Sequence, residues 1–360
     1  MATPLTNLLE EMIRRNASDL ILTEGQPPIL RLLGDLSPVE GQPSVTSEKI
    51  WEFTSELLND GQRKAFLEDP EIDVSFGLPG RARFRVNVFR QRGAVGIVIR
   101  MLPHEIPTLE SLGVPEIVKR WLLVPHGLII ITGPTGSGKS TTQAAMIGYL
   151  NQHKPYHVVT IEDPIEFTHS HGTCTIEQRE VGKDTRSFPD ALRRVFRQSP
   201  DVIMIGEMRD LETFETALQL AETGHLVLAT LHTGDTTQAI SRTVDIFPPE
   251  QHQQIRMQLS HALIGVLVQQ LVPQVDHQGR VLATEVMEAT PAVRNLIRKS
   301  DLAQIYSLIQ TSSAEGMITM NGSLLNLFKK GKISLEQAML FTTRQKELEQ
   351  LAGREVRIYA

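Results

Sequence analysis

Hydrophobic and polar positions in the first hundred residues follow two different periods. Apolar residues recur every three to four positions near the N-terminus and again further along, which predicts helices at 5–15 and 47–68. Short apolar or alternating runs predict strands at 20–22, 29–33, 72–76, 84–89 and 96–101. This mixture of elements indicates a small α+β domain over residues 1–101.

A stretch with two prolines, a glycine and little periodicity follows, and we interpret it as a linker over 102–113. Beyond it, buried apolar runs predict strands at 127–132, 158–162, 202–206 and 226–231, and helical patterns lie at 141–152 and 211–223. Buried strands that alternate with helices are typical of a parallel sheet, so we predict a doubly wound α/β domain over 114–285. From about residue 251 the chain is predicted to be mostly helical, with a C-terminal helical region over 286–360.

Composition narrows the class of protein. The chain has 360 residues, a net charge of −6 and 5% aromatic residues, which disfavours a dedicated nucleic-acid-binding protein. Cys174 is the single cysteine, so the chain can form neither an intramolecular disulfide nor a four-cysteine zinc site, and we expect a cytoplasmic protein. No apolar run reaches the ~20 residues of a transmembrane helix, and no signal peptide is evident.

Residues 133–140 match the phosphate-binding pattern G-x-x-x-x-G-K-[ST] and lie between a predicted strand and a predicted helix, as that pattern requires. Glycines let backbone N–H groups approach phosphates at a helix N-terminus. We expect Lys139 to reach the β- and γ-phosphates of ATP and Ser140 to bind Mg²⁺. The expected nucleotide-binding residues are Gly133, Pro134, Thr135, Gly136, Ser137, Gly138, Lys139, Ser140 and Thr141.

Hydrolysis of the nucleotide also requires carboxylates at the ends of neighbouring strands. Glu207 follows one apolar strand, and Glu162, Asp163 and Glu166 follow another. Each acid alone is weak evidence, because acids after strands are common as loop or cap residues. The phosphate loop strengthens them, since a parallel sheet brings those strand ends to one edge.

Histidines flank the predicted strand at 226–231. His225 and His232 are seven residues apart, about 23 Å in an extended chain, so they cannot share one metal ion. His232 is either a sensor of the γ-phosphate or a solvated loop residue. His169, His171 and Cys174 could imitate a metal site, which we disfavour because nothing supplies a fourth ligand.

Six arginines and no acid occupy residues 81–100. Strand alternation places Arg81, Arg83 and Arg85 on one face. Three interpretations remain open: a solvated sheet face, a nucleic-acid patch, or arginine fingers that reach a phosphate bound to another subunit.

Several motifs in this order resemble those of the type IV pilus retraction ATPases, the PilT/PilU group of secretion and pilus motors. The likeness extends from Ser18 to about Gly353. The motifs that carry it are Ser18–Leu20, Arg83–Asn87, the phosphate loop, Ile161–Phe167, Gly206–Asp210, Ala221–Leu226 and Thr230–Thr233. Such a set is far more specific than a phosphate loop alone.

The resemblance implies roles for individual residues. Glu166 would be the general base for the attacking water, and Glu207 the Walker B carboxylate that acts through Mg²⁺. Arginine fingers would be offered across a subunit boundary, and two histidines would lie near the phosphates. The residues at these positions are Arg85, Arg100, His225 and His232.

For the whole molecule, the resemblance implies a PAS-like N-terminal domain, a RecA-like P-loop motor and a homo-hexameric ring. ATP hydrolysis would change the angle between the domains and power pilus retraction and twitching motility. The partners would be an inner-membrane pilus platform protein and a paralogous retraction ATPase. Such a motor would be cytoplasmic and peripherally associated with the inner membrane at the pilus base.

Two further features favour retraction over pilus assembly. Residues 292–298 closely match a heptapeptide of the retraction subgroup, and we expect Arg294, Asn295 and Arg298 to face outward from that helix. Assembly ATPases of the superfamily usually carry a four-cysteine zinc element, which this chain lacks. An alternative is an accessory ATP-binding ring subunit of a pilus or type II secretion machine, with little motor activity of its own. A nucleic-acid translocase is a third and weaker reading.

Overall fold

The computed structural model describes residues 4–32, 35–78, 81–102, 105–276 and 279–356, and the chain forms two compact units. The first unit comprises Met1–Glu105 together with the short segment Pro164–Thr168. The second comprises Ile106–Asp163 and His169–Ala360. Pro103 and His104 of the predicted linker lie outside the described residues, as does Leu33 at the end of the predicted strand 29–33.

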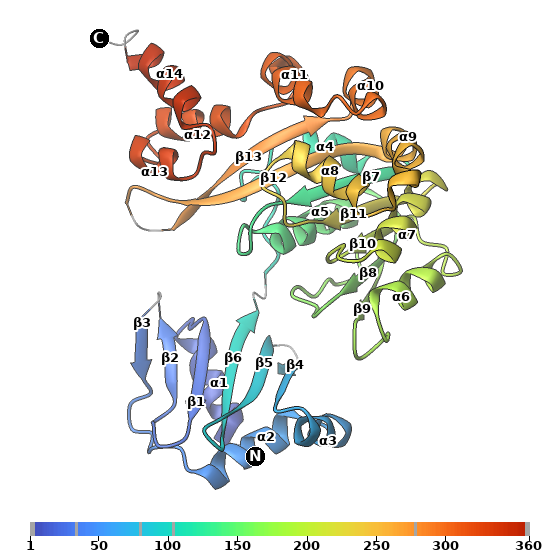
Figure 1. The fold of residues 1–360 in the computed structure, drawn as a ribbon. Coiled ribbons are helices and arrows are strands. Elements are labelled where there is room, and N and C mark those ends of the chain that lie inside the picture. The colour runs from blue at the N-terminus through green and yellow to red at the C-terminus, as the bar shows by residue number, and fades with distance from the viewer. Residues whose placement is uncertain (1–3, 33–34, 79–80, 103–104, 277–278, 357–360) are drawn as a thin grey trace. The chain divides into compact units, whose positions relative to one another are not determined.

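The first unit is built on a six-stranded sheet in the order β3-β2-β1-β6-β5-β4, with every pair antiparallel (Figure 1). Its strands are β1 (Asp19–Thr23), β2 (Ile29–Leu32), β3 (Asp35–Pro38), β4 (Glu71–Leu78), β5 (Ala82–Gln91) and β6 (Ala94–Leu102). Its helices are α1 (Pro4–Arg14), α2 (Ser47–Leu57) and α3 (Asp60–Glu68). The α+β architecture expected for this part of the chain is confirmed.

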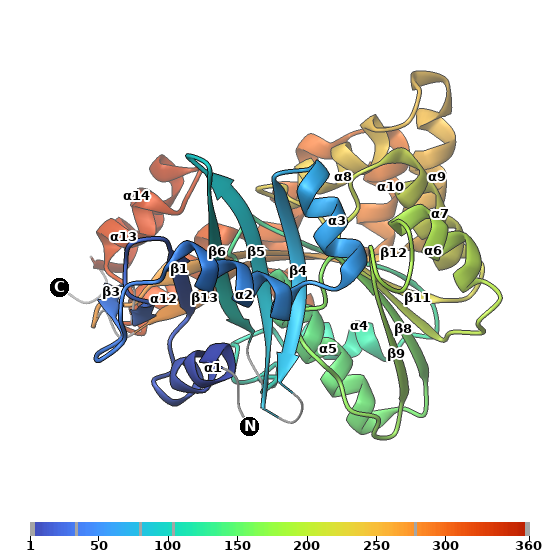
Figure 2. The ribbon, with the colours of Figure 1, turned by 90° about the horizontal axis from the view of Figure 1, so that it is seen from below.

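One face of this sheet is covered by its helices, and Figure 2 shows α1, α2 and α3 in front of the strands. Alternation along β5 explains which face is covered, because Phe84, Val86 and Val88 are buried against the helices. Arg83 and Arg85 therefore lie on the opposite face of the sheet.

The helix predicted over 47–68 is two helices. The chain breaks at Leu58 and Asn59, because Asn59 caps α3: its side chain accepts a hydrogen bond from the Gln62 N–H, and the Gln62 side chain accepts one from the Asn59 N–H. This capping box stops one helix and starts the next within two residues. Strand β3 was not predicted, since its four residues are polar or exposed and carry no apolar period.

The second unit contains a seven-stranded sheet in the order β13-β12-β7-β11-β10-β8-β9. All neighbours are parallel except β12 and β13. The strands are β7 (Gly127–Thr132), β8 (His157–Glu162), β9 (Thr175–Glu180), β10 (Val202–Ile205), β11 (Leu226–Thr230), β12 (Leu263–Pro273) and β13 (Arg280–Glu288). A mixed α/β fold with a parallel-dominated sheet is thus confirmed.

Helices cover both faces of this sheet (Figure 1). On one face, α4 (Ile117–Leu122) and α5 (Lys139–His153) share a core around Trp121 and Met146. The helices of the other face are α6 (Phe188–Val195), α7 (Leu211–Glu222), α8 (Thr236–Asp245), α9 (His252–Ala262), α10 (Pro291–Lys299) and α11 (Ile305–Thr311). A third core joins β12 and β13 to α12 (Met320–Lys329), α13 (Leu335–Leu340) and α14 (Gln345–Val356).

The prediction that the chain is mostly helical beyond about residue 251 is wrong between 263 and 288. Strands β12 and β13 form a long antiparallel hairpin there, and β12 pairs in parallel with β7. A continuous apolar run does not distinguish a buried strand from a buried helix by its period. The proposed division between 285 and 286 falls inside β13.

Helix α10 begins with Thr290 as N-cap and Pro291 in its first turn. The expectation that Arg294 faces outward is wrong. Its guanidinium donates hydrogen bonds to the backbone carbonyls of Ala289, Ser260 and His261. The last two carbonyls belong to the final turn of α9, so Arg294 satisfies acceptors that the helix end leaves unpaired. This arginine joins two helices.

Candidate active site

Four parallel strands of the second unit end at the same edge of the sheet, and the predicted chemistry gathers there. The phosphate loop follows β7, Glu162 ends β8, Glu207 follows β10, and His232 follows β11. Because parallel strands have their carboxyl ends on one side, the topology alone brings these residues together.

The phosphate loop adopts a backbone that only glycine can follow at its first position. Gly133 has φ +145°, and a Cβ placed on it would lie 2.2 Å from the backbone oxygen of Gln269 in β12. Gly136 and Gly138 have φ +76° and +89°, in the left-handed region that disfavours other residues. Strand β12 is therefore a wall of the loop.

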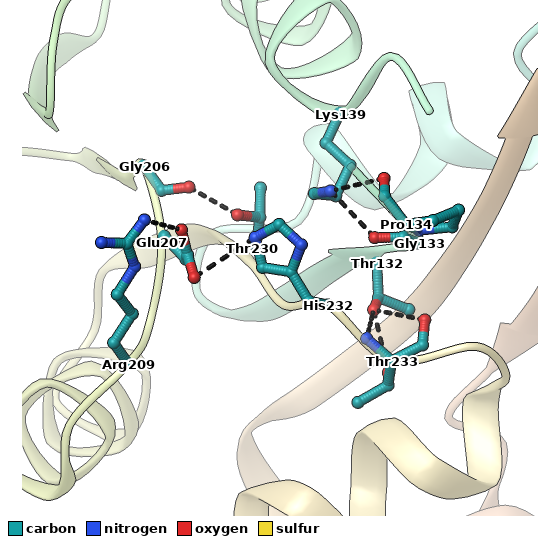
Figure 3. A network of polar contacts seen from close by, with 10 residues as sticks. All are labelled: Thr132, Gly133, Pro134, Lys139, Gly206, Glu207, Arg209, Thr230, His232 and Thr233. Atoms are coloured by element: carbon teal, nitrogen blue, oxygen red, sulfur yellow. Dashed lines mark hydrogen bonds and ion pairs between the residues drawn. The ribbon is translucent and has the colours of Figure 1, made fainter. Parts of the chain in front are cut away.

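Lys139 begins α5 and is buried, with 8% of its surface exposed. Its Nζ donates hydrogen bonds to the backbone oxygens of Gly133 (2.9 Å) and Pro134 (3.0 Å), so the ammonium group lies across the loop (Figure 3). Ser137 Oγ is buried and has no hydrogen-bond partner among the described residues. A buried hydroxyl without a partner inside a positively charged loop is suited to an anionic ligand.

Glu207 forms the second centre of the site. Arg209 Nη2 donates to its Oε2 at 2.7 Å, and His232 Nε2 lies 3.2 Å from its Oε1 (Figure 3). Burial on its own raises the pKa of the Glu207 carboxyl, but the hydrogen bond from Arg209 and the charge of His232 outweigh burial, so the pKa lies below its usual value. Glu207 is thus held as a carboxylate.

Hydrogen bonds tie the strand ends to one another. Thr233 N donates to Thr132 Oγ1 at 2.8 Å, which joins the segment after β11 to the end of β7 (Figure 3). Thr230 Oγ1 donates to the Gly206 carbonyl at 2.5 Å, which joins β11 to the residue before Glu207. The phosphate loop, Glu207 and His232 are therefore parts of one connected framework.

Glu162 is buried at the end of β8 and accepts hydrogen bonds from Thr160 Oγ1 (2.7 Å) and Gln178 Nε2 (3.1 Å). Asp163, the next residue, is exposed. Glu166 is half-buried and lies in the segment 164–168, which belongs to the first unit, whereas Lys139 and Glu207 belong to the second.

Arg85 and Arg100 are direct cross-strand neighbours on β5 and β6. Arg100 Nε donates to Asp19 Oδ1 at 2.9 Å, and Arg85 Nε lies 3.5 Å from Asp73 Oδ1. The side chain of Arg100 is 65% exposed and that of Arg85 is 43% exposed, so both guanidinium groups keep surface with which to contact a ligand. They belong to the first unit.

The structure places His225 away from the phosphate loop of its own chain, so a position near phosphates stays a prediction for this residue. His225 precedes β11, so it lies at the amino end of the parallel strands, where its carbonyl accepts from the Gly127 N–H at the start of β7. Its Nδ1 is 3.1 Å from the Leu220 carbonyl, and its ring contacts Phe196.

His169, His171 and Cys174 each have local partners instead of sharing a site. Cys174 Sγ donates to the Lys154 carbonyl, and His171 Nδ1 accepts from the Ile176 N–H. Burial lowers the pKa of His169 to about 4. Within the described ranges, no group of three or more His, Cys, Asp or Glu side chains could hold a metal ion.

Sequence reasoning missed three contributors to this site. Arg209 lies two residues after Glu207, and a basic residue so close to a candidate carboxylate could have been noticed. Gln269 contacts the loop from β12 and donates to Thr142 Oγ1, but its strand had been predicted as helix. Gln178 carries no signal in the sequence, since its importance depends on the register between β8 and β9.

Fold and site together define a P-loop nucleotide-binding protein with a doubly wound sheet. The chain belongs to the Type II/IV secretion system protein family, whose model matches residues 66–340. The resemblance seen in the motifs is confirmed.

Relatives are similar over nearly the whole chain. The Pseudomonas aeruginosa protein named "Type IV pilus retractation ATPase PilT" is 48% identical over 334 residues, 93% of this chain and 96% of the relative. "Type IV pilus ATPase PilU" from the same organism is 44% identical over 332 residues, 92% of this chain and 87% of the relative. A structure described as "Crystal Structure of the Pilus Retraction Motor PilT and Bound ADP" superposes with a TM-score of 0.90 at 48% identity, covering 96% of this chain and 98% of that one.

Proposed function

We propose that this protein is an ATPase motor that powers retraction of a type IV pilus. The observation that carries the proposal is the placement of Lys139, Glu207 and His232 at the carboxyl ends of adjoining parallel strands, tied together by hydrogen bonds. The likeness to PilT over 93% of the chain supports retraction as the process that hydrolysis drives.

The loop is suited to the phosphates of ATP. Backbone N–H groups at the start of α5 and the ammonium of Lys139 would bind them, and Ser137 Oγ would gain the partner that it lacks. Ser140 and Glu207 would hold Mg²⁺, and their hydroxyl and carboxylate oxygens are the ligand types that this ion prefers. When bound, Mg²⁺ neutralises charge on the phosphate oxygens.

Remaining roles belong to residues on both units. Glu166 would accept the proton of the attacking water, and His232, hydrogen-bonded to Glu207, would respond to the γ-phosphate. Arg85 and Arg100 would stabilise charge on a nucleotide bound to a neighbouring subunit, which requires a ring such as a homo-hexamer. In this proposal the linker 102–113 and the loop containing Glu166 transmit the change between an N-terminal domain and the motor.

The proposed function also implies where in the cell this protein acts. The ring would lie in the cytoplasm at the pilus base and act on an inner-membrane platform protein, alone or beside a paralogous ATPase. The named relatives PilT and PilU support this assignment. Consistent with a peripheral position, the described residues contain no helix that is long and apolar enough to cross a membrane.

ATP turnover by purified variants tests the chemistry. Lys139→Ala and Glu166→Gln should each lower kcat by at least about a hundredfold while the protein stays folded, because one removes a phosphate contact and the other the base. Glu215→Gln, on the exposed face of α7, is the matched control and should turn over ATP normally. Full activity in either of the first two variants would contradict the proposed site.

A further inference from the structure

Four residues at the base of the loop between β8 and β9 are joined by hydrogen bonds. Glu162 Oε1 accepts from both Thr160 Oγ1 at 2.7 Å and Gln178 Nε2 at 3.1 Å. Gln178 Oε1 accepts from the backbone N–H of His169 at 2.8 Å. We call Thr160, Glu162, Gln178 and His169 the loop clamp.

The orientation of the Gln178 amide follows from its contacts with Glu162 and with the His169 N–H. A carboxylate can only accept, and a backbone N–H can only donate, so the amide nitrogen must face Glu162 and the amide oxygen must face His169. Strand register explains why Gln178 reaches both, because it pairs with Thr160 in the parallel ladder two residues before the end of β9. Burial of Glu162, which is 8% exposed, strengthens the requirement that its oxygens be satisfied.

The clamp closes a loop whose middle belongs to a different part of the molecule. Residues 164–168 are part of the first unit, whereas Asp163 and His169 at either end are part of the second. The clamp holds the chain immediately before the loop, through Glu162, and immediately after it, through the His169 N–H. Both ends are therefore attached to one amide group.

We propose that Gln178 and Glu162 are positioning residues that hold Glu166 in the geometry needed for hydrolysis. This inference rests on the proposed function, since it takes Glu166 as the general base. Neither residue would touch the nucleotide. Both act on the rate because displacing a catalytic group by about 1 Å can cost on the order of a hundredfold in rate.

Steady-state ATP hydrolysis by the full chain carrying Gln178→Leu tests the clamp. The leucine fills a similar volume but makes neither hydrogen bond, so kcat should fall between about ten- and a hundredfold. The KM for ATP should change little, because Gln178 is not part of the phosphate loop. The melting temperature should fall by a few degrees, because the buried Glu162 carboxylate loses one donor. Glu177→Gln is the matched control: it is the exposed neighbour on the same strand and should keep the original kcat.

A charge swap distinguishes loop positioning from general packing. Gln178→Glu places one carboxylate against another and should lower kcat, because the donor to Glu162 is lost and the charges repel. The double variant Glu162→Gln with Gln178→Glu restores one amide donor facing one carboxylate, and the His169 N–H keeps an acceptor. Most of the lost kcat should return in the double variant.

Three results would overturn the inference: normal kcat in Gln178→Leu, a double variant no faster than Gln178→Glu alone, or a loss of kcat in Gln178→Leu that comes with an equally large rise in the KM for ATP. Glu166→Gln measured alongside separates this inference from the proposed function. If Glu166→Gln hydrolyses ATP normally, the assignment of the base fails and the clamp proposal fails with it. If only the clamp variants are normal, the base stands and the clamp does not.

Discussion

The imidazole of His169 is largely withdrawn from water in the folded chain, and burial lowers its pKa from 6.5 to about 4. In the unfolded chain this group takes up a proton near its ordinary pKa, so between about pH 6.5 and 4 the unfolded state binds more protons. Acidification through that window therefore favours unfolding. The difference between the two pKa values of His169 corresponds to about 3 kcal/mol in the free energy of unfolding, lost in full only below about pH 4.

Replacing His169 by Gln should flatten this pH dependence. The free energy of unfolding, measured in urea at pH 7 and at about pH 4.5, should fall less in His169→Gln than in the original chain. His126→Gln is the matched control, since His126 is exposed, and it should leave the slope unchanged. An identical slope in His169→Gln would mean that this imidazole is as well hydrated in the folded state as in the unfolded one.

At the scale of elements, strand β12 connects the core of the second unit to its phosphate loop. Near its start, β12 packs against Trp121, which is 1% exposed. Further along the strand, the Gln269 carbonyl leaves no room for a side chain at Gly133. A Cβ at Gly265 would lie 2.4 Å from the Trp121 ring. Gly265 therefore lets the indole pack directly on β12, at the position where β12 pairs with Ile129 of β7.

Two glycine-to-alanine substitutions should have opposite effects on stability. Gly265→Ala should lower the free energy of unfolding by about 1–3 kcal/mol, because the buried indole has no room to shift. Gly148→Ala, inside α5 with its nearest atom at 3.7 Å, should raise it by about 0.5–1 kcal/mol through helix propensity. Chemical denaturation of both variants checks the pair. A free energy of unfolding in Gly265→Ala that does not fall would show that β12 moves away from Trp121 at little cost.

Much of this arrangement could be predicted from the chain alone, because buried runs such as 127–132 and 202–206 follow a strong local pattern. Long-range pairing was harder to foresee. Strand β12 lies next to β7 by tertiary contact, and an apolar run of that kind is compatible with a helix until its neighbour is known. Arg294 illustrates the same limit, since the period of its helix predicts exposure, whereas its guanidinium donates to two carbonyls of α9 and to one just before α10.

In the candidate site too, residues specified by a local motif could be predicted, whereas residues placed by strand direction or register could not. Lys139, Ser140 and Glu207 were predictable because a contiguous motif or a strand end specifies each of them. The position of His225 was not, since the direction of β11 within the sheet decides which of its two flanking histidines faces the loop. The contacts of Gln178 depend on the register between β8 and β9, which no sequence pattern indicates.

At the scale of the whole molecule, the proposal divides each active site between two subunits. The phosphate loop belongs to one unit of the chain and Arg85 to the other, and the proposed ring would supply them from neighbouring copies. A head-to-tail ring makes every interface identical, so one arginine can serve each nucleotide.

Mixing two inactive variants tests this division. Arg85→Ala and Lys139→Ala should each turn over ATP slowly, since one lacks the finger and the other the loop. Random rings assembled from equal amounts should regain activity at about a quarter of their sites, where an intact loop meets an intact arginine from the next subunit. Turnover in the mixture that stays at the level of the separate variants would contradict sharing between subunits.

The central claim, that hydrolysis in this protein powers retraction, is tested most directly by counting surface pili. Cells whose single copy carries Glu166→Gln, at normal protein level, are compared with cells that carry Glu215→Gln as the matched control. We expect excess pili that fail to retract in the first strain and ordinary pili in the second. Ordinary numbers and ordinary retraction in the Glu166→Gln strain would contradict it, because another motor would then carry the load.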